Sequence, residues 1–233
     1  MALPVLNNET HSIKVPSQKR TVDFRPFLVK EEKVLMIVQE SKDSKKILKV
    51  IKDIISACSF NKLDPNTLTS TDLEYIFLQL RATSVGESTT INIKCSNCDE
   101  YTKNVINIKE IEVVEGEELD SNIKITDDVG IILKSISLTE AEKIDTKNTE
   151  KSFNQTLMYS IESIYDADNV YPASDHTEKE LIEFIDSLSH KHLEKIQKFI
   201  QNVPKLQHTC SFKCPHCGTE NKQVLEGIES FFS

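Results

Sequence analysis

Apolar side chains recur every three to four residues in three stretches near the start of the chain. In residues 44–58 they fall on one face of a helical period with lysines opposite, which predicts an amphipathic helix. A second helix is predicted to begin at Thr71, because Thr71 and Glu74 have the spacing of a capping box. A third is predicted over residues 28–39. Residues 1–87 are therefore expected to form a mainly helical region.

Apolar and polar residues alternate in other segments, which is typical of β-strands. Near the N-terminus this pattern predicts a small hairpin or edge strand containing Ile13, Val15, Val22 and Phe24. The glutamates and aspartates of residues 115–128 indicate a solvated acidic loop. Further strands are predicted over 91–93, 105–108, 111–113 and 130–138, and the tail is expected to form a hairpin followed by a short turn at Phe231.

Helical spacing returns in the last third of the chain, before the tail. It covers residues 153–165, then 181–188 behind a capping box formed by Thr177 and Glu180, and finally residues 193–203. Pro204 is expected to end the last helix.

Composition supports an ordered globular protein. Of 233 residues, 38% are hydrophobic and 28% are charged, with only five glycines and seven prolines. The 28 basic and 37 acidic side chains give a net charge of −9, which argues against a general polyanion-binding protein. The longest purely apolar run is residues 34–38, and the first residues do not have the pattern of a secretory signal. We therefore expect a cytosolic protein without a membrane span.

Four of the six cysteines form two Cys-x-x-Cys pairs, Cys95 with Cys98 and Cys214 with Cys217. In a reducing compartment this pattern favours metal binding over a disulfide. Each pair sits between two predicted strands, so each would occupy the turn of a hairpin, as in a zinc ribbon. Four thiolates fill the coordination sphere of a zinc ion and leave no open position, so the ion is expected to be structural.

The two pairs are separated by 115 residues, far more than the usual spacing in a zinc ribbon. Closing so long a loop costs roughly 1.6 kcal/mol more than closing a short one, whereas structural zinc binding contributes about 10–16 kcal/mol in small peptides. The gap therefore permits one shared site. We predict an α+β fold, in which a helical bundle-like part (residues 1–87) is joined to a discontinuous zinc ribbon of two β-hairpins (88–138 and 206–233) with a helical insertion (139–205).

Other interpretations of the cysteines remain open. The pairs could be separate and hold no metal, or one could be a redox dithiol, although a redox pair more typically follows a strand and opens a helix. Cys210 and His216 could replace a ligand, and His208 is a more distant candidate. Cys58 lies on the apolar face of a predicted helix and is interpreted as a core residue.

The sequence contains no motif for the common enzyme classes. It has no glycine-rich phosphate loop, no Gly-x-Ser-x-Gly and no His-Glu-x-x-His. Zinc ribbons often bind nucleic acid, but the acidic and basic residues around each cysteine pair are balanced, which disfavours binding to phosphates.

Two longer strings carry a family resemblance: FRPFLVKEEKVL at residues 24–35 and DLEYIFLQLRATSVGE at residues 72–87, together with the two cysteine pairs. In these strings the chain resembles the baseplate protein family of T4-type tailed bacteriophages, the baseplate hub assembly proteins. The resemblance implies a non-enzymatic assembly factor, either a chaperone or a hub component. It also implies other baseplate hub proteins as partners and the host cell cytoplasm as the location during assembly, with the virion tail baseplate as the alternative.

The resemblance also suggests where partners bind. Arg25, Lys30 and Arg81 lie within the two strings and are expected to be exposed, so they are the candidate partner-binding residues. The alternative is that these strings maintain the fold, because helix starts and core positions fall there too. The alternative function is that of a zinc-ribbon regulatory module that binds nucleic acid.

Overall fold

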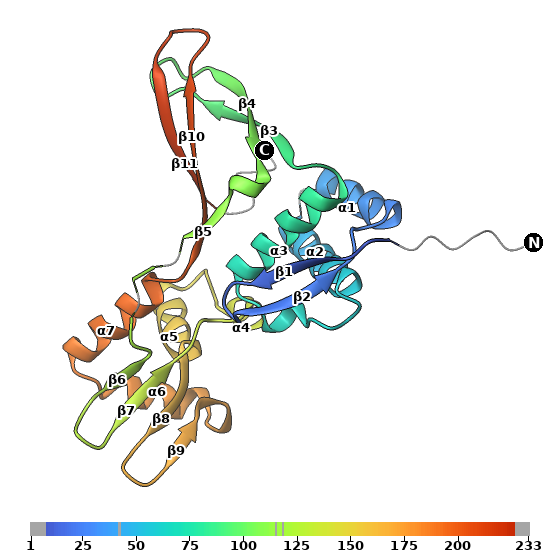
Figure 1. The fold of residues 1–233 in the computed structure, drawn as a ribbon. Helices are drawn as coiled ribbons and strands as arrows, with labels where there is room; N and C mark the ends of the chain where they lie inside the picture. The colour runs from blue at the N-terminus through green and yellow to red at the C-terminus, as the bar shows by residue number, and fades with distance from the viewer. Residues whose placement is uncertain (1–7, 42, 115, 118, 227–233) are drawn as a thin grey trace, which may run out of the picture. The chain divides into compact units, whose positions relative to one another are not determined.

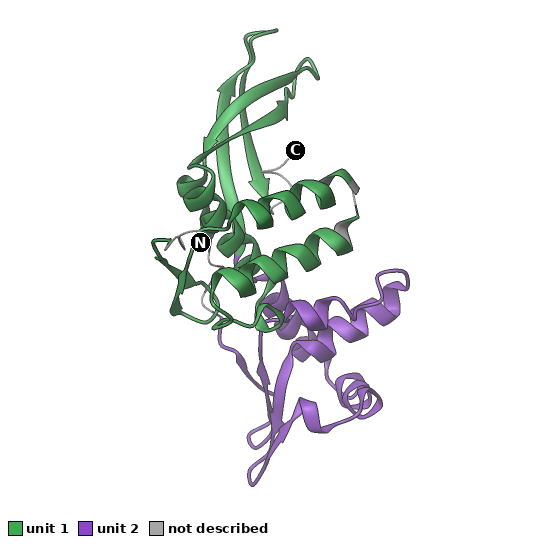
Figure 2. Ribbon diagram, turned by 90° about the vertical axis from the view of Figure 1, so that its right-hand side faces the viewer, with its two compact units in different colours: residues 1–114, 205–233 green, residues 115–204 purple. Residues whose placement is uncertain are grey.

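The computed structural model describes residues 8–41, 43–114, 116–117 and 119–226, and the turn predicted at Phe231 lies outside them. The chain divides into two compact units, coloured separately in Figure 2. Unit 1 comprises residues 1–114 and 205–233, and unit 2 comprises residues 115–204. The chain therefore leaves unit 1 after its first half and returns to it for the tail.

Helices and small antiparallel sheets make up both units, so the fold mixes α and β structure, as predicted (Figure 1). The helices of the described residues are α1 (Val29–Ser41), α2 (Ser44–Cys58), α3 (Ser70–Ser84), α4 (Leu138–Ala141), α5 (Thr149–Tyr159), α6 (Glu178–Asp186) and α7 (His190–Gln201). The strands are β1 (His11–Val15), β2 (Arg20–Phe24), β3 (Ser88–Lys94), β4 (Tyr101–Asn107), β5 (Glu112–Val114), β6 (Asn122–Lys124), β7 (Gly130–Leu133), β8 (Ile161–Tyr165), β9 (Val170–Pro172), β10 (Lys205–Lys213) and β11 (Glu220–Glu226).

The strands form four sheets, and every pairing between them is antiparallel. In unit 1, β1 pairs with β2, β3 pairs with β4, and β10 lies between β11 and β5. In unit 2 the order is β6-β7-β8-β9. Among the described residues, no helix combines the length and the apolar character that a membrane crossing requires.

The predicted helices of the N-terminal region are confirmed, with one change at the start of α3. Its capping box is formed by Thr69 and Asp72, two residues before the predicted pair Thr71 and Glu74. The Thr69 hydroxyl accepts the Asp72 N–H, and the Asp72 carboxylate accepts the Thr69 N–H. The Asp72 carboxylate also accepts the N–H and hydroxyl of Ser17 from the β1–β2 turn, at 2.8 and 2.5 Å. This fully buried carboxylate therefore joins the predicted N-terminal hairpin to α3.

The two hairpins that carry the cysteine pairs share a hydrophobic core with α3. Leu78 and Ala82 from α3 pack with Ile91 and Ile106 of the β3–β4 hairpin and with Leu206 of β10, and all of these residues are buried. The alternation of buried and exposed positions along β3 follows the period of two that its sequence predicts. This core fixes the base of both hairpins, so their turns are held at one end of unit 1 (Figure 1).

Unit 2 has its own core, which includes Ile131 of β7, Leu157 of α5 and Ile196 of α7. The helix predicted over residues 153–165 is wrong in its second half, because α5 ends at Tyr159 and residues 161–165 form β8. The β-branched Ile161 and Ile164 pair with β7, and this tertiary pairing overrides a spacing that also suits a helix. The acidic segment 115–128 likewise includes a short strand, β6.

Candidate metal centre

The two Cys-x-x-Cys turns have the same backbone design. In the β3–β4 turn, the N–H of Cys95 donates to the carbonyl of Glu100 at 2.9 Å, and the N–H of Asp99 donates to the carbonyl of Cys95 at 3.1 Å. In the β10–β11 turn, Cys214 N–H donates to the Thr219 carbonyl and Gly218 N–H donates to the Cys214 carbonyl, both at 2.9 Å. Each turn closes the end of an antiparallel hairpin and points both of its thiols to one side.

The residue after the second cysteine has a left-handed backbone in both turns. Asp99 has φ of 62° and Gly218 has φ of 75°. Glycine adopts this conformation without steric cost, and aspartate is one of the few other residues that tolerate it. The two turns therefore share a conformation as well as a spacing, although different residues occupy the left-handed position.

The structure brings all four thiols of the two pairs together, as the sequence predicts. Their sulfur atoms lie within 4.8 Å of one another, with 3.7 Å between Cys95 and Cys217 and 3.6 Å between Cys98 and Cys214. None of the four forms a disulfide. Sulfurs at the corners of a tetrahedron around zinc, with Zn–S bonds of about 2.3 Å, would lie about 3.8 Å apart. The spacing and the soft donor set therefore fit a metal ion of this kind.

The sulfurs also receive the outer hydrogen bonds that stabilise thiolate ligands. The backbone N–H of Asn97 and the side-chain amide of Asn221 each lie 3.5 Å from the Cys95 sulfur as donors. The Cys217 sulfur lies 3.3 Å from the hydroxyl oxygen of Thr219. Cys95 is fully buried, whereas Cys217 is exposed, so one edge of the cluster faces solvent.

Asn221, in β11, connects the two hairpins directly. Its side-chain oxygen accepts the N–H and the hydroxyl of Ser96 at 2.9 and 2.8 Å, while its amide donates to Cys95 and to the Thr219 carbonyl. Sequence reasoning did not identify Asn221, because a single asparagine four residues beyond a cysteine has no pattern that marks it. Gln223, two residues along the same strand, adds a hydrogen bond to the carbonyl of Lys94 at 2.7 Å.

Hydrogen bonds and burial shift the pKa values of three of the thiols in different directions. The Thr219 hydroxyl and backbone N–H lower the pKa of Cys217 to about 5, and the N–H groups of Asn97 and Cys98 lower the pKa of Cys95. The N–H of Glu100 acts in the same direction on Cys98, but burial and the neighbouring thiols raise its pKa to about 12. Several thiolates this close together repel one another, and a divalent metal ion bound between them would offset this repulsion.

Among the described residues, the cluster contains only the four paired cysteines, and the other candidate ligands lie outside it. Cys210 belongs to the hydrophobic core beneath the hairpins, and burial raises its pKa. His216 is in the second turn but is not part of the cluster, and His208 Nδ1 lies 3.3 Å from the Glu110 carbonyl. Cys58 is a buried residue of α2, as predicted, and burial raises its pKa to about 11.

The three residues suggested for partner binding have different environments. Lys30 is exposed, as expected. Full exposure is wrong for Arg25, whose side chain is only 14% exposed and forms an ion pair with Glu31 at 2.7 Å. Arg25 also donates to the Pro26 carbonyl and lies 3.6 Å from the Cys58 sulfur. Arg81 is half-buried, and its burial lowers its pKa.

Comparison with known proteins gives two matches over nearly the whole chain. A family model described as T4 bacteriophage base plate protein matches residues 8–233. The chain is also similar to the baseplate hub assembly protein gp26 of Enterobacteria phage T4, with 22% identity over 213 residues that cover 91% of this chain and 93% of that protein. No solved structure matches the chain.

Proposed function

The chain belongs to the T4 bacteriophage base plate protein family, and from this membership we propose that it is a non-enzymatic assembly factor of the phage baseplate hub. The observation that carries the proposal is the similarity to the baseplate hub assembly protein of Enterobacteria phage T4, which extends over 91% of this chain and is therefore not confined to one motif. Its partners would be other baseplate hub proteins, and assembly would take place in the host cell cytoplasm.

The cysteine cluster supports a structural zinc ion in this factor. We infer that the β3–β4 and β10–β11 hairpins form a discontinuous zinc ribbon, with the intervening chain as its insertion. Four sulfur ligands leave zinc no open position for a substrate or a reactive water, which supports a structural role over a catalytic one. The hydrogen bonds from Asn221 to both turns would orient the ligands, as outer-shell residues do in other zinc sites.

Helix α1, which begins inside the first family-like string and extends beyond its end, is the surface that best supports partner binding. Val29, Met36 and Ile37 are exposed apolar residues at helical spacing, and the exposed Lys30 lies on the same helix. Such a face suits a hub protein that presents apolar residues with acidic ones beside them. We propose Lys30 as a direct contact, and Arg25 and Arg81 as residues that support this surface from partly buried positions.

The experiment that tests the function is affinity purification of the tagged protein from phage-infected cells, with identification of the copurifying proteins. We expect baseplate hub proteins. A Lys30→Glu variant should recover less of them than a Lys14→Glu variant, which has the same charge change on β1. Quantifying the protein in purified phage particles separates a chaperone, which leaves, from a hub component, which stays. Recovery of nucleic acid in a salt-sensitive manner, without hub proteins, would overturn the proposal in favour of a nucleic-acid-binding module.

A further inference from the structure

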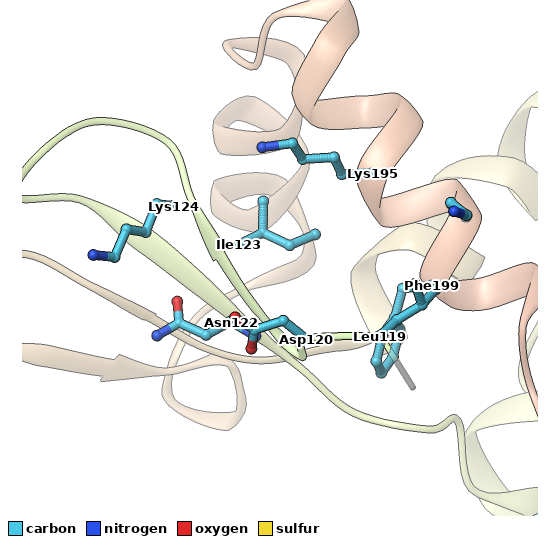
Figure 3. Close-up of a pocket in the computed structure, with 8 residues that line it drawn as sticks. Leu119, Asp120, Asn122, Ile123, Lys124, Lys195 and Phe199 are labelled. Atoms are coloured by element: carbon cyan, nitrogen blue, oxygen red, sulfur yellow. The ribbon is translucent and has the colours of Figure 1, made fainter. Parts of the chain in front are cut away.

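Unit 2 contains a cavity of about 360 Å3 between β6 and α7 (Figure 3). Its apolar part is formed by Leu119, Ile123 and Phe199, of which Ile123 is buried and the other two are half-buried. The four clustered cysteines belong to unit 1, so this cavity is a separate site. An apolar base with polar groups around it is the usual form of a binding pocket for a small ligand or a peptide side chain.

Three lysines line the cavity: Lys124 on β6, and Lys195 and Lys198 one turn apart on α7. Figure 3 shows Ile123 between Lys124 and Lys195. Lys198 forms an ion pair with Glu117 at 3.3 Å, whereas Lys124 and Lys195 form none with any described residue. Two lysines that line the cavity therefore have ammonium groups available to a negatively charged ligand.

One carboxylate, that of Asp120, also lines the cavity. It accepts the backbone N–H of Asn122 at 2.8 Å, which holds it at the start of β6. With Lys198 paired to Glu117, the two remaining lysines still outnumber Asp120, so the cavity has a local excess of positive charge. Asp120 would compete with an acidic ligand for the two ammonium groups.

The charge of the surrounding unit restricts which anion can bind. Residues 115–204 contain nineteen acidic side chains and nine lysines, and no arginine. A long polyanion such as a nucleic acid would be repelled by most of this unit, because its binding depends on many phosphate contacts. Arginine, which recognises phosphate in a bidentate manner, is missing from the sequence of the unit. A short ligand that carries carboxylates avoids both difficulties.

We propose that this cavity binds an acidic and partly apolar peptide segment of a partner protein. Its carboxylates pair with Lys124 and Lys195, and an apolar side chain contacts Ile123 and Phe199. Exposed ion pairs alone contribute little to affinity, so burial of the apolar side chain supplies part of the binding free energy. The identification of the partner as a hub protein rests on the proposed function. The chemical class of the ligand follows from the cavity alone.

The test uses the full chain and a fluorescein-labelled peptide of alternating glutamate and leucine, with a lysine–leucine peptide as the control. We expect the acidic peptide to bind in fluorescence anisotropy and the basic one to bind weakly or not at all. In the methyl and aromatic NMR spectra, resonances of Ile123 and Phe199 should shift on addition of the acidic peptide. Failure of the acidic peptide to bind, or shifts confined to other residues, would overturn the proposal.

Charge variants locate the site. Lys124→Glu with Lys195→Glu should weaken peptide binding by about tenfold, because two attractive pairs become repulsive. Lys147→Glu with Lys179→Glu makes the same change in net charge at exposed positions outside the cavity and should leave affinity within about twofold. Asp120→Asn removes the competing carboxylate and should strengthen binding about two- to threefold, which a folding defect would not produce. Equal affinity in all variants would refute the assignment.

Two further measurements distinguish this inference from its alternatives and from the proposed function. Inorganic phosphate or a single-stranded oligonucleotide that displaces the peptide at lower concentration than an unlabelled acidic peptide would show that phosphate is the ligand, against the proposal. Copurification of hub proteins without peptide binding would refute the cavity and leave the function intact. Peptide binding without any hub protein would refute the function and leave the cavity intact.

Discussion

The side-chain amide of Asn221 donates a hydrogen bond to the sulfur of Cys95, a residue 126 positions earlier in the chain. The same side chain accepts two hydrogen bonds from Ser96. With only 5% of its surface exposed, Asn221 holds the first cysteine turn against the strand that follows the second. The candidate metal centre is therefore maintained by a side chain that is not itself a ligand.

Replacing Asn221 by alanine is expected to lower zinc affinity by about 10- to 100-fold, as is typical for the loss of an outer-shell partner. The four thiols remain, so the variant should still bind zinc at saturation. Competition with a chromophoric chelator measures the affinity. Gln223→Ala removes a neighbouring hydrogen bond that reaches a backbone carbonyl and no sulfur, so its effect should be smaller. An unchanged affinity in Asn221→Ala would show that this side chain does not stabilise the site.

Zinc content provides a direct test of the ligand set. The purified protein is expected to contain about one zinc ion per chain, and a variant with Cys95→Ser and Cys214→Ser should lose it, because each turn then keeps a single thiolate. Metal analysis by mass spectrometry measures both. Cys210→Ala, which alters a buried thiol outside the cluster, should retain the ion. Full zinc content in the double variant would exclude the proposed site.

Asp72→Ala should destabilise unit 1 by about 2–4 kcal/mol. The change removes the Asp72 half of the α3 capping box and leaves the donors of Thr69, which is buried, and of Ser17 without their acceptor. Urea unfolding followed by circular dichroism measures the loss. Asp64→Ala removes an exposed cap that accepts only the Asn66 N–H and should cost about 1 kcal/mol or less. Equal costs in the two variants would argue against the role of Asp72 as a link between the hairpin and α3.

The Arg25–Glu31 ion pair should make stability depend on pH. Burial acts to raise the pKa of Glu31, but hydrogen bonds from Arg25 and the Leu28 N–H outweigh it and hold the pKa below its ordinary value of 4.5. A depressed pKa means that the stabilisation is fully present above pH 4.5 and is lost as the pH falls through the folded-state pKa. Removing one partner of such a buried pair typically costs about 3 kcal/mol.

Glu31→Gln is therefore expected to be less stable than wild type by a constant amount between pH 7 and about pH 5, with the difference shrinking at more acidic pH. Thermal unfolding across this range measures it. Glu32→Gln, the adjacent and more exposed position on α1, should show no such convergence. A difference for Glu31→Gln that grows on acidification would contradict the assigned direction of the pKa shift.

Gly218 offers a test of backbone conformation without a steric clash. A Cβ atom at this position would have no neighbour within 4 Å, so Gly218→Ala should cost only the conformational penalty of its positive φ, about 1 kcal/mol. Gly218→Asp should cost less, because aspartate already occupies the matching position at residue 99. Chemical denaturation of the zinc-loaded protein measures both. A larger loss in the aspartate variant would mean that the two turns are not conformationally equivalent.

The cysteine cluster could be predicted from sequence because ligand chemistry dictates the spacing within each pair and loop entropy penalises a long gap only weakly. Asn221 could not, since its role depends on the register of β11 beside the first turn. The start of α3 was ambiguous for a similar reason. Thr69 with Asp72 and Thr71 with Glu74 have the same spacing, and the donors of the distant Ser17 favour the first pair.

Residues 161–165 illustrate a second limit. Ile161 and Ile164 continue the helical spacing of α5, yet they form a strand. Their side chains are β-branched, and the backbone of this segment pairs with the edge of β7. The lysine-lined cavity likewise depends on a contact between segments that are distant in the sequence. Lys124 and Lys195 are far apart in sequence and become neighbours only when β6 and α7 form the same cavity. Local patterns predict elements well, whereas contacts between distant elements depend on the complete fold.

The long separation of the two cysteine turns has a consequence for biosynthesis. Cys217 leaves the ribosome 122 residues after Cys95, which at roughly 5–20 residues per second is a delay of about ten seconds. During that time the first pair offers a metal only two ligands, and the ribosome translates all of unit 2, which has its own core. Translation therefore sets one limit on the order of events: the four-thiol site cannot be completed until unit 2 and the second cysteine turn have both been synthesised.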